Sequence, residues 1–328
     1  MKERNHNESP NLTDKRRTRS ISSIFVIVLL FFPTILFADA KTINFMLLEN
    51  GRIVKIDIIQ KKTPTLSRAF PLWDKPIGLS LVDFETEKEI LRLTPDEKKT
   101  GILLGAYPLD SERIACNFLD DTTGKRTYNT GVWNIRTKEL RLYKGTGSGY
   151  ADEISGMHPD ETKFISCPYV PRGIDFHDLT DKTKKYLFAD LHGKSSRFSP
   201  DGSRYAFFGD DDNKENYYLI IQLINDSKTY KIEFKKGESK NDRPSGRVLT
   251  WSPSGSFIAG IVDHYFVKEK LYIWKSNGEL ISTIDLPFST EWGWPPLWLS
   301  SEKEIAVFHR NGKSDKISYR IFEIKTGI

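Results

Sequence analysis

Residues 198–207 read Phe-Ser-Pro-Asp-Gly-Ser-Arg-Tyr-Ala-Phe, a turn-forming tetrapeptide followed by a short aromatic run. Pro200 fixes φ near about −65°, Asp201 accepts hydrogen bonds from the backbone that follows it, and Gly202 adopts positive φ with little strain. The aromatic residues Tyr205 and Phe207 favour an extended strand. The stretch therefore predicts a tight turn inside a β-hairpin.

The same order of apolar strand, polar turn and apolar strand occurs five times along the chain. The turn positions taken as equivalent are Asp110, Asp160, Asp201, Ser254 and Glu302, which gives intervals of 50, 41, 53 and 48 residues. A period of this length is typical of repeat architectures in which each repeat is one supersecondary unit.

A second hairpin follows the first within a repeat. In residues 271–284 the turn Lys275-Ser276-Asn277-Gly278-Glu279 separates two runs of alternating apolar residues, and Asn-Gly is a strong hairpin signal. Four antiparallel strands per repeat are what a propeller blade contains. The repeat therefore indicates an all-β fold.

The number of repeats predicts six blades. Residues 53–93 form a degenerate first blade, and the last repeat has one strand-like run, residues 317–322, after its first hairpin. The missing strand would leave an unpaired edge, and we expect residues 43–48 to fill it. The predicted fold is a six-bladed β-propeller of four-stranded antiparallel blades, closed by an N-terminal strand, in a single domain of residues 41–328.

The turn Ser199-Pro200-Asp201-Gly202 ahead of an Ala-Phe strand resembles the repeats of the TolB-like β-propellers, a WD-repeat-like family. The resemblance covers roughly residues 95–310 and is close at two repeats and looser at three. It implies a periplasmic or cell-surface domain that binds proteins or small ligands and usually carries no chemistry of its own. Ser254 and Glu302 depart from the family pattern, which has Asp in this turn.

The first 40 residues have the parts of an export signal. A basic region ends at residues 15–19, an apolar stretch covers residues 21–37, and small residues follow up to Ala40. We predict cleavage after Ala40, so that residues 1–40 are a signal peptide. The alternative is an uncleaved anchor, although Pro33 interrupts the stretch and a spanning helix needs roughly 20 apolar residues.

No further long apolar segment follows, so we expect no transmembrane span in the mature chain and a periplasmic, cell-surface or secreted protein. The net charge is +5, and basic and acidic residues are interspersed after the signal region. Such a surface lacks the one-sided basic patch of nucleic-acid-binding proteins. We expect a monomer whose partner is an envelope protein or a glycan, and no nucleic acid.

The sequence holds no recognised catalytic motif. Its six histidines are scattered without metal-ligand spacing, and the glycine-rich residues 145–149 lack the flanking strand and helix of a phosphate-binding loop. The acidic run at residues 209–216 offers oxygen ligands for calcium, but without EF-hand spacing a solvated turn is the commoner meaning. We predict no metal, no cofactor and no catalytic residue. The alternative is a hydrolase or lyase that uses carboxylates at the channel mouth and His264.

Candidate binding residues gather on one predicted face. The loops between second and third strands, and between blades, emerge opposite the Pro-Asp-Gly turns, and loops on a rigid scaffold commonly carry recognition. Nine residues are placed there: Asp120, Asp121, Tyr150, Asp152, Asp210, Asp211, His264, Trp292 and Trp294. The two tryptophans are candidates because Trp is enriched at binding hot spots. The alternative is that both indoles cap the last blade.

Two cysteines, Cys116 and Cys167, lie in apolar strand-like runs. In an exported chain they can form one disulfide. Buried unpaired cysteines behave as small hydrophobic residues, and we expect two buried thiols.

The signal region gives the first test. We expect the protein in an envelope fraction, and N-terminal sequencing should read Lys41 first, because cleavage follows Ala40. Full-length chain in the cytosol would contradict both the location and the processing.

Overall fold

The chain divides into two units, Met1–Lys41 and Thr42–Ile328, and every residue described below lies in the second. The computed structural model describes residues 43–49, 52–61, 75–109, 112–120, 127–147, 154–166, 174–178, 180–181, 183–188, 192–210, 216–224, 226, 228–234, 244–264, 268–290, 294–299, 301–311 and 314–324.

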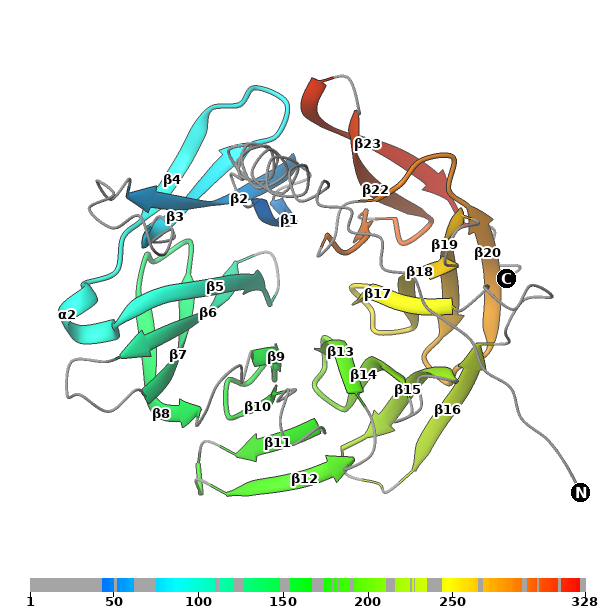
Figure 1. Ribbon diagram of the computed structural model, residues 1–328, viewed down its shortest axis with the longest axis horizontal. Coiled ribbons are helices and arrows are strands. Elements are labelled where there is room, and N and C mark those ends of the chain that lie inside the picture. Colours follow the sequence, from blue (N-terminus) through cyan, green and yellow to red (C-terminus); the bar gives the residue numbers. More distant parts are fainter. Residues whose placement is uncertain are drawn as a thin grey trace, which may run out of the picture. The chain divides into compact units, whose positions relative to one another are not determined.

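Six antiparallel sheets, here numbered 1 to 6, follow one another along the chain (Figure 1). Their strands are β1 (Ile43–Glu49), β2 (Arg52–Lys61), β3 (Lys75–Asp83) and β4 (Glu89–Leu93) in sheet 1; β5 (Ile102–Pro108), β6 (Arg113–Asp120), β7 (Thr127–Asn134) and β8 (Leu140–Gly147) in sheet 2; β9 (Ile154–Met157), β10 (Lys163–Ser166), β11 (Ile174–Asp178) and β12 (Lys184–Phe188) in sheet 3; β13 (His192–Phe198), β14 (Arg204–Asp210), β15 (Tyr217–Leu223) and β16 (Thr229–Phe234) in sheet 4; β17 (Pro244–Trp251), β18 (Phe257–His264), β19 (Lys268–Lys275) and β20 (Leu280–Asp285) in sheet 5; and β21 (Leu297–Trp298), β22 (Glu304–Asn311) and β23 (Ser314–Glu323) in sheet 6. The helix α2 (Glu97–Thr100) is a single turn. The predicted all-β class is confirmed for the described part of the chain.

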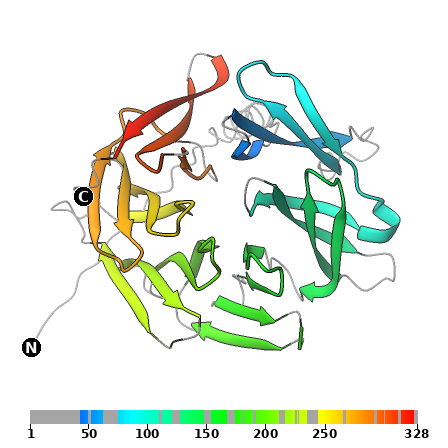
Figure 2. The ribbon, with the colours of Figure 1, turned by 180° about the vertical axis from the view of Figure 1, so that it is seen from behind.

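Each sheet is one continuous stretch of chain whose strands pair in sequence order. The first strands of successive sheets contact one another, β9 with β13, β13 with β17, β17 with β21, and β1 with both β5 and β21. Figures 1 and 2 show these first strands on the inside of the second unit and the fourth strands on its outside.

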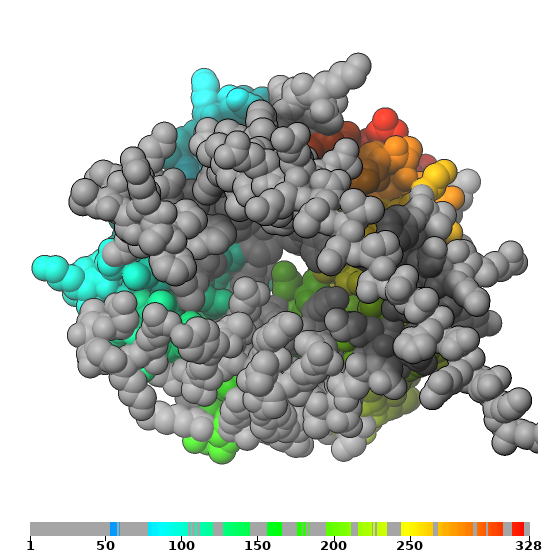
Figure 3. Space-filling model, viewed as in Figure 1, coloured from blue at the N-terminus to red at the C-terminus, as the bar shows by residue number. Residues whose placement is uncertain are grey.

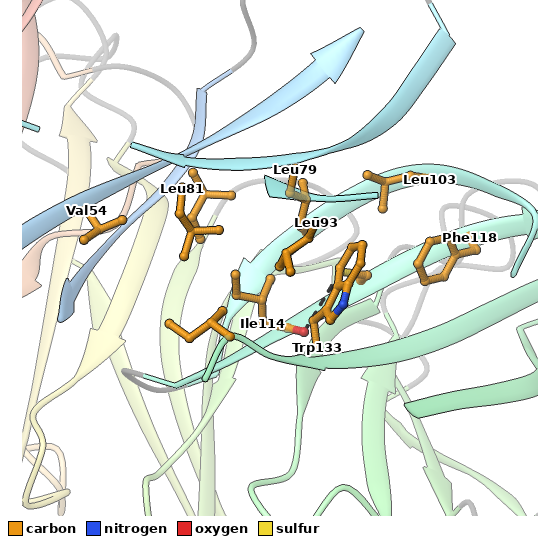
Figure 4. Packing of buried hydrophobic residues seen from close by; sticks show 12 residues of the cluster. Val54, Leu79, Leu81, Leu93, Leu103, Ile114, Phe118 and Trp133 are labelled. Carbon is orange, nitrogen blue, oxygen red and sulfur yellow. Dashed lines mark hydrogen bonds between the residues drawn. The ribbon is translucent and has the colours of Figure 1, made fainter. Parts of the chain in front are cut away.

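Six hydrophobic clusters join neighbouring sheets. Between sheets 1 and 2, Leu79 and Leu93 pack against Ile114 and Trp133, all with exposed fractions of 3% or less (Figure 4). Four clusters likewise join sheets 2 and 3, 3 and 4, 4 and 5, and 5 and 6. A sixth cluster contains Phe308 of sheet 6 and Phe84 after β3 of sheet 1. The hydrophobic core is therefore divided among the junctions between sheets.

The repeated turns connect the first and second strand of a sheet. The N–H of Ser199 donates to the carbonyl of Arg204 at 2.8 Å, and the same bond closes the turns that begin at His158, Ser252 and Leu299. Asp160 and Asp201 therefore occupy equivalent turn positions, as predicted. Asp110 lies outside the described residues, and the turn that contains it closes one residue earlier, from Leu109 N–H to the Arg113 carbonyl.

The predicted equivalence of Glu302 with the turn aspartates is wrong by one position. Glu302 has a φ of 52°, and the residues with positive φ in the other turns are Glu161 at 63°, Gly202 at 71° and Gly255 at 71°. Glu302 therefore matches the turn glycine, and Ser301 stands where Asp201 stands.

The predicted closure by an N-terminal strand is also wrong. The strand β1 pairs with β2, with Leu48 opposite Ile53 and Leu47 opposite Val54, so it completes sheet 1 and adds nothing to sheet 6. The reason is local: Asn50-Gly51 separates the two runs, and this dipeptide favours a hairpin between adjacent strands. A contact that is close in sequence forms with less loss of chain entropy than one nearly 300 residues away.

Cys116 is a free and fully buried thiol on β6, as expected, and burial raises its pKa. Cys167 lies outside the described residues. No helix in the described part of the chain is both long and apolar enough to cross a membrane.

The turn at Asp201 supports a test of stability against pH. Its carboxylate accepts hydrogen bonds from Ser199 Oγ at 2.6 Å and from Ser203 N–H and Oγ at 3.1 and 2.8 Å. Burial raises the pKa of Asp201, but these hydrogen bonds outweigh it and the net pKa is lowered. A lowered pKa stabilises the fold above the ordinary pKa of the carboxyl, and that contribution is lost as the pH falls through the folded-state pKa.

We expect Asp201→Asn to lower the free energy of unfolding by about 1 kcal/mol at pH 7 and by less at pH 3, measured by urea denaturation. An equal loss at both pH values would show that the charge of Asp201 contributes nothing.

Candidate functional site

Three of the candidate residues that the structure describes lie at strand ends, on the side of the sheets opposite the repeated turns. Asp120, Asp210 and His264 are the last residues of β6, β14 and β18, the second strands of sheets 2, 4 and 5. We call this side, with the connections between second and third strands and between sheets, the loop face. The other candidates except Trp294 lie outside the described residues: Asp121, Tyr150, Asp152, Asp211 and Trp292.

Asp210 and His264 belong to facing surfaces of sheets 4 and 5. Alternation along β14 puts Asp210 on the side of Phe208, which packs toward sheet 5, and alternation along β18 puts His264 on the side of Val262, which packs toward sheet 4. Both residues are buried, with exposed fractions of 3% and 9%. The imidazole Nε2 of His264 lies 3.0 Å from the hydroxyl of Tyr272, and the two rings stack.

Trp294 is a core residue. Its exposed fraction is 3%, and it belongs to the cluster that includes Phe308 and Phe84. An indole covered in this way is not available to a partner at the surface. For Trp294 the structure therefore supports the alternative prediction, in which the indole packs on the last sheet. Trp292 lies outside the described residues.

Sequence analysis missed a buried ionic cluster at the loop face between sheets 5 and 6. It consists of Arg247 on β17, Asp263 on β18, Glu269 on β19 and Thr290 after β20, and we call it the ion latch. Arg247 Nη2 lies 2.7 Å from Asp263 Oδ2, and Arg247 Nη1 lies 2.6 Å from Glu269 Oε1. The other carboxylate oxygen of Glu269 accepts from Thr290 N–H at 2.7 Å and from Thr290 Oγ1 at 2.5 Å.

A β-bulge brings Arg247 into this cluster. The pairing of β17 with β18 skips Arg247, since Gly246 is opposite Val262 and Val248 is opposite Ile261. A bulge turns one side chain away from the regular alternation. Gly246 is required beside it, because a Cβ at this position would lie 2.1 Å from the ring of Phe208 in sheet 4.

The charged side chains of the ion latch are largely shielded from water. The side chains of Arg247, Asp263 and Glu269 have exposed fractions of 11%, 19% and 6%. Charges this buried are stable only when they are paired and hydrogen-bonded. One guanidinium faces two carboxylates here, and the donors of Thr290 supply the remaining stabilisation of Glu269.

The ion latch fixes one side of the connection between sheets 5 and 6. Thr290 has an exposed fraction of 6%, and Thr290 also forms a β-bridge with His309 on β22. Trp294, four residues later, is buried on the other side. Residues 291–293, which include the candidate Trp292, therefore connect two buried anchor points.

The opposite side of the sheets, the turn face, is occupied by contacts between neighbouring turns. Glu161 accepts from Arg113 Nη1 at 3.0 Å, from Arg141 Nη1 at 2.8 Å and from Tyr143 OH at 2.9 Å. Burial is the main cause of the raised pKa of Tyr143.

Two further contacts join turns across the next junctions. His158 Nε2 lies 2.9 Å from the Gly202 carbonyl, and Glu302 accepts from Ser254 Oγ at 2.8 Å. His158 thus joins the turns of sheets 3 and 4. Glu161 and Glu302, which both have positive φ, gain ion-pair or hydrogen-bond partners in the preceding sheet.

The described residues contain no group of three or more His, Cys, Asp or Glu side chains arranged to hold a metal ion. Residues 211–215 of the acidic run are outside them. The glycine-rich segment of residues 145–149 begins inside strand β8, which covers Leu140–Gly147.

No protein-family model matches the sequence, and no curated protein matches it. Solved structures do match the fold. TolB from Acinetobacter baumannii matches with a TM-score of 0.52 and 16% identity over 75% of this chain and 57% of that chain. Hydrazine synthase from Kuenenia stuttgartiensis matches with a TM-score of 0.52 and 9% identity over 89% of this chain and 98% of that chain.

The β-propeller domain of Cps50 (Swd1) from Myceliophteria thermophila matches with a TM-score of 0.50 and 12% identity over 86% of this chain and 84% of that chain. The match to TolB spans 57% of the length of that TolB chain. At these identities the similarity shows the fold alone, and the resemblance to TolB-like propeller repeats is confirmed at that level. The three names belong to proteins of unlike function, so the function must be argued from the site.

The ion latch supports a test of stability. We expect Glu269→Ala to lower the free energy of unfolding by roughly 3 kcal/mol, because it leaves Arg247 buried beside a lost partner. Urea denaturation measures the change. The matched control is Asp285→Ala, which breaks the ion pair of Lys270 with a carboxylate that is 64% exposed and should change the stability by less than about 0.5 kcal/mol. Equal losses in the two variants would contradict a buried latch.

Proposed function

We propose that this TolB-like β-propeller is an exported, non-catalytic scaffold of the cell envelope that binds a protein or glycan partner through its loop face. Export follows from the apolar residues 21–37 and the small residues up to Ala40. The fold supplies the rigid scaffold, and loops held by such a scaffold are where recognition usually lies.

The ion latch is the observation that carries the proposal. Three residues, Arg247 on β17, Asp263 on β18 and Glu269 on β19, fix Thr290, and the core fixes Trp294. A loop fixed on both sides loses less conformational freedom when it binds, so its affinity is higher for the same contacts. Trp292 lies between Thr290 and Trp294 in the sequence and is the proposed aromatic anchor.

Asp120 and the candidates outside the described residues supply polar groups around that anchor, whereas Asp210 and His264 are buried and do not contact the proposed partner. Asp120, Asp210 and His264 end second strands, and Asp121, Tyr150, Asp152 and Asp211 follow or lie between such strands in the sequence. A polar margin around an aromatic anchor is the usual composition of a binding surface. The proposed partner therefore presents hydrogen-bond donors to the carboxylates and an apolar patch to Trp292.

The alternative of a hydrolase or lyase places different demands on the same residues. His264 would have to reach a substrate, yet its exposed fraction is 9% and its Nε2 is engaged with Tyr272. Catalysis would require Tyr272 to move or to act in the reaction. Binding requires neither, and for that reason we prefer it.

We also infer that the six sheets are six blades and that side-chain packing closes the ring between sheets 6 and 1. Tyr319 OH donates to Glu85 Oε1 at 2.9 Å, and the ring of Phe84 lies 5.4 Å from that of Tyr319 and 5.8 Å from that of Phe308. Edge-to-face contacts of this kind add to the hydrophobic packing. They support closure without a strand shared between the ends of the chain.

The proposal is tested with Trp292→Ala. Immobilised protein should capture a partner from an envelope extract, and the variant should bind it about thirtyfold more weakly, since an aromatic hot spot contributes roughly 2 kcal/mol. Binding is measured as the dose of extract that gives half-maximal capture.

The matched control is Leu280→Ala, which removes a side chain that is 52% exposed on the outer strand β20. It should leave capture unchanged. If Trp292→Ala folds and captures as well as the unchanged protein, the loop-face proposal is wrong at its anchor.

A further inference from the structure

The last sheet has an outer edge that no described strand pairs with. In sheets 1 to 5 a fourth strand lies beside the third, whereas the described strands of sheet 6 end with β23. Residues of sheet 6, orange to red, reach the surface at the margin of the face drawn in Figure 3. A strand at an edge presents backbone N–H and C=O groups that can pair with another extended chain.

The side chains of β23 are less buried than those of third strands in other sheets. The strands β7, β15 and β19 bury five, three and four residues, respectively, most of them near the middle of the strand. Between Ile317 and Glu323, no residue of β23 is buried.

An alanine in the second strand marks the equivalent position in four sheets. Ala115 pairs with Val132, Ala206 with Ile221, Ala259 with Ile273 and Ala306 with Ile321. The exposed fractions of the four partners are 3%, 0%, 0% and 50%, respectively. The same type of side chain at the same register position is thus covered in sheets 2, 4 and 5 and uncovered in sheet 6.

The covering side chains in the other sheets come in part from the fourth strand. Ile221 lies opposite Tyr230 of β16, and Leu219, two residues before it, lies opposite Ile232. Cross-strand neighbours of this kind bury each other's apolar surface. Sheet 6 lacks such neighbours for Ile321 and Tyr319 among the described strands.

We propose that the outer edge of β23 is a docking site for one extended segment of a partner polypeptide, which pairs antiparallel with β23 as a fourth strand. This inference does not depend on the loop face, because β23 lies on the outside of the second unit and carries none of the proposed loop-face residues.

The repeats of this chain define the chemistry of the segment. The residue opposite the Tyr319 position is Tyr143, Ile232 or Ile284 in sheets 2, 4 and 5, always large and apolar or aromatic. The residue two places earlier, opposite the Ile321 position, is Arg141, Tyr230 or Ser282, each with a polar group. The partner segment therefore has an amphipathic or polar residue, any residue, and then a large β-branched or aromatic residue, within about six extended residues.

The probe for this site is a peptide with the sequence of residues 228–235, Lys-Thr-Tyr-Lys-Ile-Glu-Phe-Lys, which contains β16. A fluorescently labelled copy should bind the full chain, measured by anisotropy, and should slow amide hydrogen exchange in β23. A control peptide with Ile232→Pro lacks a backbone donor and breaks the alternation, so it should not bind.

Two matched variants locate the binding. Ile321→Lys places a charge on the proposed edge and should weaken peptide binding by at least about tenfold, since lysine on an edge strand opposes pairing. Leu280→Lys changes a side chain of similar exposure, 52% against 50%, on β20 and should leave binding unchanged. Both substitutions are at exposed positions, and equal urea midpoints would show that both variants fold.

The proposal is overturned if the peptide does not bind the unchanged protein, which would mean that another part of the chain already covers the edge. It is overturned equally if Ile321→Lys binds the peptide as well as Leu280→Lys does. Neither result bears on the capture experiment with Trp292→Ala.

Discussion

Each sheet of this chain has apolar side chains on both of its faces, so it is stable only where a neighbouring sheet covers each face. The strand β14 shows the constraint most directly. Tyr205 and Phe207 pack toward sheet 3, whereas Ala206 and Phe208 pack toward sheet 5. Burying each large side chain contributes about 1.5–3 kcal/mol, and half of that contribution would be missing in a sheet with one neighbour. The arrangement of the described sheets follows from this need for two neighbours.

The turn face and the loop face meet that constraint with different chemistry. On the turn face, Glu161 and Glu302 hold a backbone conformation that favours glycine, and their carboxylates bind residues of the preceding sheet. Positive φ in a non-glycine residue costs of order 1 kcal/mol, which such contacts offset. On the loop face, the ion latch uses buried charges between sheets 5 and 6. Hydrogen bonds and ion pairs therefore support sheet junctions on both faces.

The repeat could be predicted from the sequence, but the pairing of the first strand could not. Turn residues such as Pro200, Asp201 and Gly202 act within a few residues, so their effect can be recognised locally, and the hairpins they predict are present. The partner of β1 depends on a choice between a nearby and a distant strand, and the Asn50-Gly51 signal for the nearby one was overlooked. The one-position error at Glu302 has a similar origin, because no local sequence pattern indicates that a glutamate will adopt positive φ.

The candidate site was predicted in outline only. The ends of second strands follow from the repeat, which is why Asp120, Asp210 and His264 share one side. The burial of Trp294 depends on packing against Phe84, more than 200 residues away, and no local pattern reports it. The ion latch combines residues 16 to 43 positions apart through a bulge at Arg247. A bulge changes the direction of one side chain, which alternation alone does not predict.

The contact between sheets 6 and 1 joins residues that lie much farther apart in the sequence than those of the other junctions. The other hydrogen bonds between sheets described above join residues at most 48 positions apart, whereas Tyr319 and Glu85 are 234 positions apart. For a flexible chain, closing the longer loop costs about 1.4 kcal/mol more in entropy. Contacts that are near in sequence form sooner than distant ones. The junctions between consecutive sheets would thus form before the junction at Phe84, which joins the first and the last of the described sheets.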